Sequence, residues 1–301
     1  MGVQAVIKGV GGYLPQKILT NKDLEAMVET SDEWIFQRSG IRQRHIADEN
    51  ETTSDMALKA AEDALKHAGM VAQDVDAIIV ATTTPDRTFP ATAVHVQAAL
   101  GLAHGFAFDV QAVCSGFVYA LSTANGLIKT GQAKNILVIG AEKMSSIIDW
   151  TDRTTCVLFA DGAGAVVLSA EEGKDGEKGI VSAHLHSDGR QKDLLYTSGG
   201  TATTGDAGVI LMEGKEVFKH AVQSLADVVD ETLEYNNIKP EEIDWLVPHQ
   251  ANIRIIEGMQ KKMGLSDERV VKTVGEHANT SAASIPLALS AAVDDGRIQE
   301  G

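Results

Sequence analysis

The stretch "FAFDVQAVCSGFVYALSTANGLIKTGQAKNILVIGAEKM", residues 106–144, alternates two kinds of apolar segment. Phe106–Val110 is a short apolar run of strand length, and Phe117–Ile128 is apolar on most faces and reads as a helix. A second buried strand follows within 131–144. Strand, helix and strand in this order predict an α/β fold in which helices pack on buried strands. Cys114 lies between the first predicted strand and the predicted helix.

The composition is that of an acidic globular protein. The chain has 301 residues, enough for two lobes, and a net charge of −16, which opposes binding to nucleic acid or to an anionic membrane. No apolar run reaches the ~20 residues of a membrane span, and the start reads as a strand and a turn, not as a signal peptide. Cys114 and Cys156 form no CxxC pair, so we expect no disulfide framework and a reduced, cytoplasmic compartment.

The order of elements repeats along the chain. The same order of a helix, an acidic link, an aspartate and a buried strand is predicted for residues 52–84 and again for 214–250. The two aspartates are Asp76 and Asp244, which lie 168 positions apart. Cys114 and Asn279, 165 positions apart, each precede a helix rich in Ala and Ser. We therefore predict two duplicated halves, residues 1–170 and 171–301, although any α/β protein alternates in this way.

The repeat also bears on the end of the chain. The first half continues with two apolar strands at the point where the second half reaches Gly301. Two C-terminal strands that the symmetry calls for are thus absent from the sequence, and we expect the natural protein to continue beyond this residue.

Cys114 is the first candidate for chemistry. A thiol in the first turn of a helix meets unpaired N–H groups and the positive end of the helix dipole, which favour the thiolate. A small buried apolar residue is the commonest role of a free cysteine, and both interpretations stay open. Cys156 falls inside "TTCVLFA", where we expect a buried position within a strand.

His249 and Asn279 are the other candidates. His249 follows a predicted strand, precedes a helix and has Gln250 and Asn252 beside it, at an edge where open α/β sheets place ligand sites. A helix N-cap would by itself explain Asn279. A cysteine, a histidine and an asparagine also form the constellation of cysteine proteases, so the spacing does not choose the reaction. The remaining histidines have no metal-ligand spacing, and we expect no metal.

Taken in order, the motifs resemble the β-ketoacyl-[acyl carrier protein] synthase III family of the thiolase superfamily. The matching stretches are "TSDEWI", "RSGIR", "VATTTPD", "FP", "AVCSGF", "TDRTT", "DGAGA", "MEGKEVFK", "VPHQANIRI" and "NTSAAS". The resemblance implies a thiolase-like α/β fold of two duplicated βαβαβ halves in layered α-β-α-β-α order. It implies an acyltransferase that moves an acyl group from coenzyme A to a cysteine and condenses it with malonyl-carrier protein, the first step of fatty-acid synthesis. Coenzyme A thioester is then a substrate, and no cofactor is implied.

The resemblance also implies roles for individual residues. Cys114 is the nucleophile, and His249 and Asn279 complete the triad. The residues implied for coenzyme A are Trp34 and Arg153 on either side of the adenine, Arg38 near the phosphates, and Thr30, Asn252 and Phe218 along the pantetheine tunnel. Phe89 reaches into the acyl pocket of a partner, which implies a homodimer. Arg254, Lys261 and Lys262 share one helix face and are expected to receive the acidic carrier protein, although a solvated helix face explains them equally well.

Two departures from the family pattern affect these expectations. Ala278 stands where the family has glycine, so a positive φ there would cost about 1 kcal/mol. The family also continues with a strand and a "GGGFTWG"-like loop that supplies a second oxyanion N–H, and a protein ending at Gly301 is expected to be weakly active or inactive. The alternatives are a relative that makes a secondary metabolite or joins acetyl-CoA to acetoacetyl-CoA, a cysteine hydrolase, and a non-catalytic subunit. The presence of Cys114 argues against the last.

Overall fold

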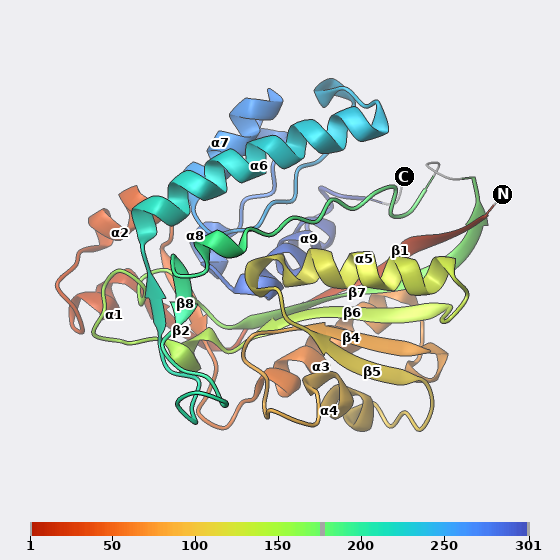
Figure 1. Cartoon of the computed structure of the whole chain (residues 1–301), viewed down its shortest axis with the longest axis horizontal. Coiled ribbons are helices and arrows are strands. Elements are labelled where there is room, and N and C mark those ends of the chain that lie inside the picture. The colour runs from red at the N-terminus through yellow and green to blue at the C-terminus, as the bar shows by residue number, and fades with distance from the viewer. Residues whose placement is uncertain (1, 175–177, 300–301) are drawn as a thin grey trace.

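The computed structural model describes residues 2–174 and 178–299, which form layers of helices on both sides of one sheet (Figure 1). The sheet has the strand order β1-β7-β6-β4-β5. Its strands are β1 (Gly2–Tyr13), β4 (Ala77–Ala81), β5 (Phe106–Val110), β6 (Asn135–Glu142) and β7 (Gly162–Gly173). Strand β4 runs parallel to β5 and β6, whereas β7 is antiparallel to both β6 and β1. The α/β prediction made from residues 106–144 is therefore correct.

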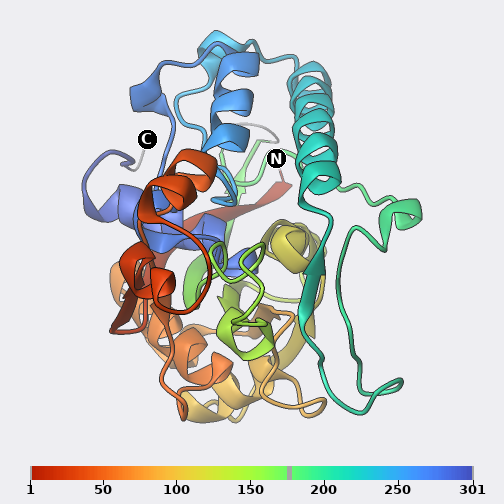
Figure 2. The ribbon, with the colours of Figure 1, turned by 90° about the vertical axis from the view of Figure 1, so that its left-hand side faces the viewer.

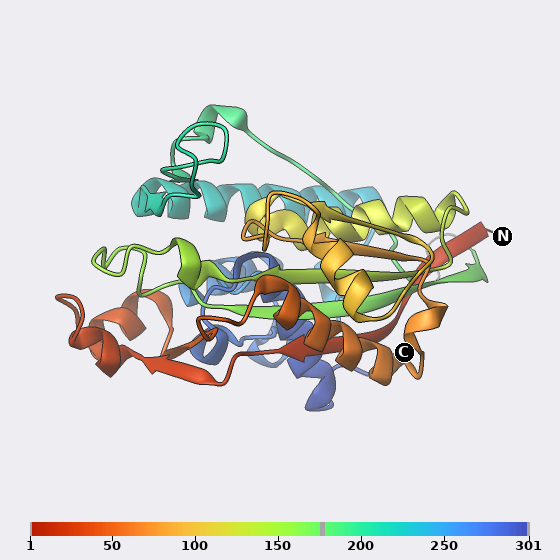
Figure 3. The ribbon, with the colours of Figure 1, turned by 90° about the horizontal axis from the view of Figure 1, so that it is seen from below.

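Helices cover both faces of this sheet. Helices α3 (Thr53–Ala68) and α4 (Thr92–Ala99) lie on one face, as the view from below shows (Figure 3). Helices α5 (Gly116–Lys129) and α9 (Ser284–Asp294) lie on the other. Helices α6 (Gly214–Asn236) and α7 (Ile253–Met263) form the outermost layer, beyond α9 (Figures 1 and 2).

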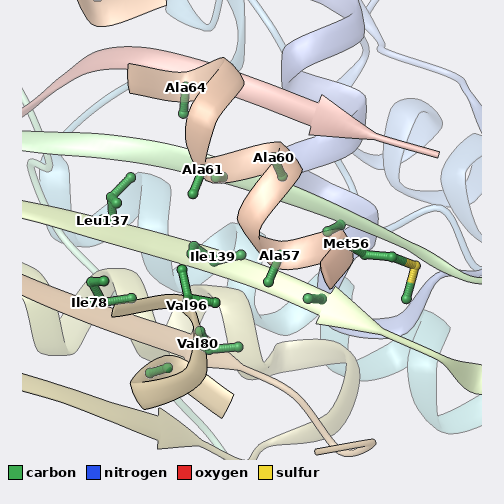
Figure 4. Packing of buried hydrophobic residues seen from close by; sticks show 14 of the residues in the cluster. Met56, Ala57, Ala60, Ala61, Ala64, Ile78, Val80, Val96, Leu137 and Ile139 are labelled. Carbon is green, nitrogen blue, oxygen red and sulfur yellow. The ribbon is translucent and has the colours of Figure 1, made fainter. Parts of the chain in front are cut away.

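Small residues let α3 approach the sheet closely. Its alanines at 57, 60, 61 and 64 are fully buried and face the strands that carry Ile78 and Leu137 (Figure 4). A Cβ on Gly11 of β1 would lie 2.2 Å from the backbone nitrogen of Ala64, so only glycine fits there. Because successive strand residues face opposite sides, the remaining residues of β4 and β6 bury themselves against α5.

The other elements are short. They are α1 (Asn21–Glu25), α2 (Asp32–Ser39), α8 (Val274–His277), β2 (Lys17–Thr20), β3 (Gln43–Ile46), β8 (Leu195–Thr197) and β9 (Ile210–Met212). The 3₁₀ turns are η1 (Ala72–Asp74), η2 (Val113–Ser115), η3 (Met144–Ile147), η4 (Gly189–Gln191), η5 (Pro240–Glu242), η6 (Asp267–Arg269) and η7 (Ser281–Ala283).

The predicted strand before His249 is wrong for the described residues. Leu246 makes an isolated parallel bridge with Val270, and the segment from 243 to 249 has no other strand partner there. A strand needs a continuous ladder, and two backbone hydrogen bonds around Leu246 do not make one. Trp245 and Val247 of this segment pack against a small buried cluster that includes Ala288 and Ala292 of α9. A cavity of about 630 Å³ lies among segment 180–186, α5 and α6.

Two junctions in the chain match each other closely. Val113 opens η2 with φ 48°, and Ser281 opens η7 with φ 49°, 168 positions later. Each turn leads directly into a helix, α5 or α9. The spacing equals that of Asp76 and Asp244. The structural counterpart of Cys114 is therefore Ala282, and the pairing of Cys114 with Asn279 at a spacing of 165 is wrong.

Three local expectations also need correction. The polar stretch 187–208 is rich in Gly and Thr, which predicts a loop, but it contains β8, which pairs with β9 in a hairpin. Cys156 is fully buried as expected, but it lies in a turn and not in a strand. Strand β7 runs to Gly173, so the expected boundary between residues 170 and 171 falls inside it.

Ala278 has the strained backbone that its sequence context predicts. It ends α8 with φ 54° and ψ −157°, a region that glycine occupies at little cost, and it is fully buried. The methyl group therefore raises the free energy of the folded state.

We expect Ala278→Gly to raise the free energy of unfolding by about 1 kcal/mol, because the glycine removes this strain. Denaturant unfolding measures the change. Ala283→Gly is the matched control: Ala283 is equally buried but has φ −74°, so glycine there should lower the stability by about 0.5–1 kcal/mol. Equal losses in both variants would contradict the prediction.

Candidate active site

Cys114 lies in η2, between the end of β5 and the start of α5. Cys114 as a whole residue is partly exposed, but its sulfur is buried. This burial raises the pKa of the thiol to about 11. A hydrogen bond with the Ser281 side chain acts in the opposite direction but does not compensate. The sequence-based expectation that the helix N-terminus favours the thiolate is therefore wrong for this resting site, because desolvation is the larger effect.

Asn279 lies between α8 and η7. Its backbone forms a parallel bridge with Phe159, donating to the Leu158 carbonyl at 3.0 Å and accepting from Ala160 at 3.0 Å. Its side-chain Oδ1 accepts a hydrogen bond from the backbone N–H of Ser281 at 2.9 Å. The N-cap interpretation is wrong, since α9 begins five residues later without a side-chain cap. With Oδ1 occupied, the amide NH₂ has no partner among the described residues.

His249 is positioned by its neighbour Gln250, which is fully buried. The backbone N–H of Gln250 donates to Ser284 Oγ at 2.7 Å, at the start of α9. Its side-chain amide donates to the carbonyls of Pro248 and Val271 and accepts from the N–H groups of residues 273 and 274. Gln250 thus ties the histidine segment to residues 271–274 through its side chain and to the start of α9 through its backbone.

The imidazole of His249 sits in a desolvated position. Its Nδ1 is buried without a hydrogen-bond partner in the described part of the chain. Burial lowers the pKa of His249 to about 4, so the ring is neutral at pH 7 and carries one N–H donor.

The structure gathers these groups around the first turns of α5 and α9. Turn η2 packs on η7, and a Cβ on Gly116 would lie 3.5 Å from that of Ala282. Ser281 of η7 donates its backbone N–H to Asn279 Oδ1, and its side chain lowers the pKa of the Cys114 thiol against the larger effect of burial. Gln250 brings the His249 segment to the same helix start.

The sequence interpretation missed Glu142, which ends β6 and is fully buried. Ser281 Oγ donates to its Oε1 at 3.1 Å, and Thr84 Oγ1 donates to its Oε2 at 2.7 Å. Thr82 and Thr83 add further hydrogen bonds. Burial raises the pKa of Glu142 despite these donors. A glutamate directly after the apolar run "NILVIGA", at the carboxyl end of a central strand, was a signal that the sequence contained.

The residues expected around coenzyme A border a separate cavity of about 500 Å³. Its lining includes Trp34, Arg38, Lys215, Phe218, Asn252 and Arg254. The guanidinium carbons of Arg38 and Arg153 lie 5.4 and 5.3 Å from the Trp34 ring centre. Asn252 Nδ2 donates to the Arg38 carbonyl at 2.9 Å, which joins α2 to the start of α7. Thr30 does not line the cavity, and its hydroxyl is buried without a partner among the described residues.

The remaining expected residues lie on the surface. Arg254 stands 5.0 Å over the Phe218 ring, Lys262 pairs with Asp230 of α6 at 2.7 Å, and Lys261 is exposed. Phe89 is 81% exposed on the loop after β4. Within 2–174 and 178–299, no cluster of side chains suits a metal ion, and no helix is long and apolar enough to cross a membrane.

The chain matches known proteins over its whole length. Residues 108–189 match 3-oxoacyl-[acyl-carrier-protein (ACP)] synthase III, and residues 233–301 match the C-terminal part of that enzyme. The chain is 62% identical to β-ketoacyl-[acyl-carrier-protein] synthase III of Rhodospirillum centenum over 302 residues, covering 100% of this chain and 94% of that protein. The counterpart from Paramagnetospirillum magneticum is also 62% identical, over 303 residues with the same coverage.

Solved structures agree with these sequence matches. The crystal structure of 3-oxoacyl-[acyl-carrier-protein] synthase III from Aquifex aeolicus superposes with a TM-score of 0.92 at 47% identity, over 99% of this chain and 93% of that one. The enzyme from Pseudomonas aeruginosa gives 0.90 at 43% identity, over 99% and 92%. The chain therefore belongs to the β-ketoacyl-[acyl-carrier-protein] synthase III family of acyltransferases with the thiolase-like α/β fold.

Proposed function

We propose that Cys114, His249 and Asn279 carry out the condensation by which this acyltransferase joins an acyl-CoA to malonyl-carrier protein and so initiates fatty-acid synthesis. The observation that carries the assignment is the packing of turn η2, which holds Cys114, on turn η7, where the Ser281 backbone N–H donates to Asn279 Oδ1. A nucleophile on the first lobe and an amide donor from the second are thereby held at one place.

In the first half-reaction, the Cys114 thiol loses its proton to solvent and its sulfur attacks the thioester carbonyl. The bond from the acyl carbon to the coenzyme A sulfur breaks, and coenzyme A leaves as its thiolate, which takes up a proton from solvent. The acyl group is then held as a thioester on Cys114 and stays activated. The Cys114 backbone N–H, in the first turn before α5, can donate to the carbonyl oxygen while it bears negative charge.

In the second half-reaction, the malonyl thioester loses CO₂ and its carbonyl oxygen becomes an enolate. The NH₂ of Asn279 has no other partner in the described part of the chain, and neutral His249 offers one ring N–H. Two uncharged donors can hold this oxygen, each worth about 3 kcal/mol. The enolate carbon attacks the acyl-cysteine and releases the Cys114 sulfur.

The cavity beside Trp34 is the proposed site for coenzyme A. An indole face and a planar guanidinium can both stack on a purine, and Arg38, Arg153 and Lys215 bring positive charge for phosphates. Arg254, Lys261 and Lys262 of α7 remain the proposed docking face for the acidic carrier protein, since all three side chains are exposed.

A homodimer is proposed from the free edge of the sheet. Strand β5 pairs with β4 on one side only, and its Phe106 and Phe108 rings stack 6.3 Å apart. An edge strand of this kind is a template for pairing with a second copy. Phe89 would then lie near the partner's acyl pocket.

The duplication of halves 1–170 and 171–301 is proposed from the matching junctions at Val113 and Ser281. A layered arrangement of two βαβαβ units would follow from it. The two free cysteines support a reduced, cytoplasmic compartment.

We expect His249→Ala and Asn279→Ala each to slow condensation about 100-fold, because each removes one donor to the enolate. Acetylation of Cys114 by acetyl-CoA should persist, which intact-protein mass measurement detects. Burial keeps the pKa of His249 near 4, so malonyl decarboxylation should show no inflection near pH 6.5.

His277→Ala is the matched control for the histidine. His277 also has a buried Nδ1 without a partner in the described chain and a pKa lowered to about 4, but it is not assigned to the site. Its condensation rate per folded molecule should be unchanged. Loss of Cys114 acetylation in all three variants would argue against the assigned roles.

We expect Trp34→Ala to raise KM for acetyl-CoA about tenfold, because it removes the proposed stacking partner of the adenine, while the condensation of pre-acetylated enzyme keeps its rate. Phe36→Ala is the control: Phe36 lies on the same helix and carries Arg42 4.0 Å over its ring, but does not line this cavity. A KM effect of similar size in both variants would refute the assignment.

We expect Phe89→Ala to change the ratio of kcat/KM between acetyl-CoA and isobutyryl-CoA by several-fold, because Phe89 would border the partner's acyl pocket. Tyr235→Ala, which removes a 74% exposed ring from α6, should leave the ratio unchanged. Light scattering should give the mass of a dimer for both. A monomer that is active with an unchanged ratio would overturn the proposal.

A further inference from the structure

Asn279 is held both by its backbone and by its side chain. Its backbone bridges Phe159, because its N–H donates to the Leu158 carbonyl and its own carbonyl accepts from the Ala160 N–H, each at 3.0 Å. Its side-chain Oδ1 accepts the Ser281 backbone N–H at 2.9 Å. The first contact fixes where the side chain begins, and the second acts on the direction in which its amide faces.

The Ser281 contact decides between the two orientations of the Asn279 amide. A backbone N–H can only donate, so Oδ1 is the amide atom that can face it. Turning the amide over would replace this hydrogen bond with two donors in contact. While Ser281 keeps its place, the oxygen stays engaged and the NH₂ group is left for another acceptor.

Ser281 needs support to keep this place. Its backbone has φ 49°, a conformation that a non-glycine residue adopts only where the surroundings enforce it. The turn η7 has no side-chain cap at its start. The hydroxyl of Ser281 supplies an anchor instead, since Oγ donates to Glu142 Oε1 at 3.1 Å.

Glu142 is a firmly held partner for this hydroxyl. It is fully buried and ends β6, which lies between β4 and β7 in the sheet. Its Oε2 accepts the Thr84 hydroxyl at 2.7 Å and the Thr83 backbone N–H at 3.0 Å. The hydroxyls of Thr82 and Thr83 add further hydrogen bonds. The sheet thus fixes the carboxyl, and the carboxyl fixes the turn that carries Ser281.

We propose that Glu142 is a positioning residue for the condensation step: through the Ser281 hydroxyl it holds η7 so that the Asn279 amide offers its NH₂ group to the enolate oxygen. The inference rests on the proposed role of Asn279 as a donor to that oxygen. Glu142 touches neither substrate nor reacting atoms, and it neither gains nor loses a proton in the step.

Ser281 requires a polar partner at residue 142, but not a charge. In Glu142→Gln, the Thr83 N–H can only donate and therefore selects the carbonyl oxygen, which leaves the NH₂ group for Ser281 Oγ. A hydroxyl can accept as well as donate, so this contact persists with its direction reversed. In Glu142→Ala the contact is lost.

The test is the single-turnover rate at which the full chain, already acetylated on Cys114, condenses with malonyl-carrier protein. We expect Glu142→Ala to slow this step about tenfold, because a misdirected amide stabilises the enolate less well. Glu142→Gln should recover most of the lost rate. Ser281→Ala removes the same contact from the other side and should match Glu142→Ala, so it carries the test if Glu142→Ala fails to fold.

A double-mutant cycle distinguishes positioning from a general structural role. Asn279→Ala already lacks the amide, so adding Glu142→Ala should change its condensation rate less than twofold. A further tenfold loss in the double variant would mean that Glu142 acts independently of Asn279, and would overturn the inference.

Asp76→Ala is the control for loss of stability. Asp76 Oδ2 accepts the backbone N–H groups of residues 134 and 135, at the opposite end of β6 from Glu142. Its removal should lower the free energy of unfolding and leave the condensation rate of the folded, acetylated protein unchanged. Equal slowing in Asp76→Ala and Glu142→Ala would reduce the effect to destabilisation and refute the positioning role.

The rate of Asn279→Ala separates this inference from the proposed function. If Asn279→Ala condenses at the native rate, the proposed role of Asn279 itself fails. If Asn279→Ala is slow while Glu142→Ala and Ser281→Ala keep the native rate, the role of the amide stands and its positioning by Glu142 is wrong. A Gln variant as slow as the Ala variant would also contradict the inference, because it would show that the charge and not the contact is needed.

Discussion

The close approach of η7 and α9 to β6 and β7 is the contact on which the site depends. A Cβ on Gly140 would lie 2.2 Å from the Ala282 carbonyl oxygen, and one on Gly164 would lie 2.5 Å from the Leu287 nitrogen. These glycines on two neighbouring strands thus let η7 and α9 approach the sheet to contact distance. Glu142 lies two residues beyond Gly140 and faces the same side, so the approach that Gly140 permits also brings Ser281 to the carboxyl.

Desolvation governs the electrostatics of this region more than any single partner does. Burial is the largest cause of the raised pKa of Cys114 and Glu142 and of the lowered pKa of His249. All three groups are therefore pushed toward their neutral forms. Neutral donors suit an enolate, whereas attack on a thioester requires the Cys114 thiol to give up its proton.

The sequence predicted the elements that have a strong local signal. Helix α3 and strand β4 lie inside the stretch 52–84, which was predicted as a helix followed by a buried strand, and β6 lies inside the strand predicted within 131–144. The segment around Leu246, before His249, is also apolar. A strand forms there only if neighbouring strands complete its hydrogen-bond ladder, and the local sequence does not show whether such strands are present. Asn279 looked like a cap because Asn often is one, whereas its backbone is engaged by Phe159, 120 positions earlier. The hydrogen bonds of Glu142 could not be predicted because its partners are distant in sequence: residues 82–84, which follow β4, and Ser281 of η7.

Gln250 has a consequence for anyone who would move this constellation to another scaffold. Its amide joins residues 248, 271, 273 and 274, and its backbone joins residue 284, so three separate pieces of chain meet at this one uncharged residue. Copying only a sulfur, an imidazole and a carboxamide into a new host would leave the ring free to rotate with its loop. A transplant would need this hidden glutamine and its acceptors as well, which makes the minimal portable unit much larger than three residues.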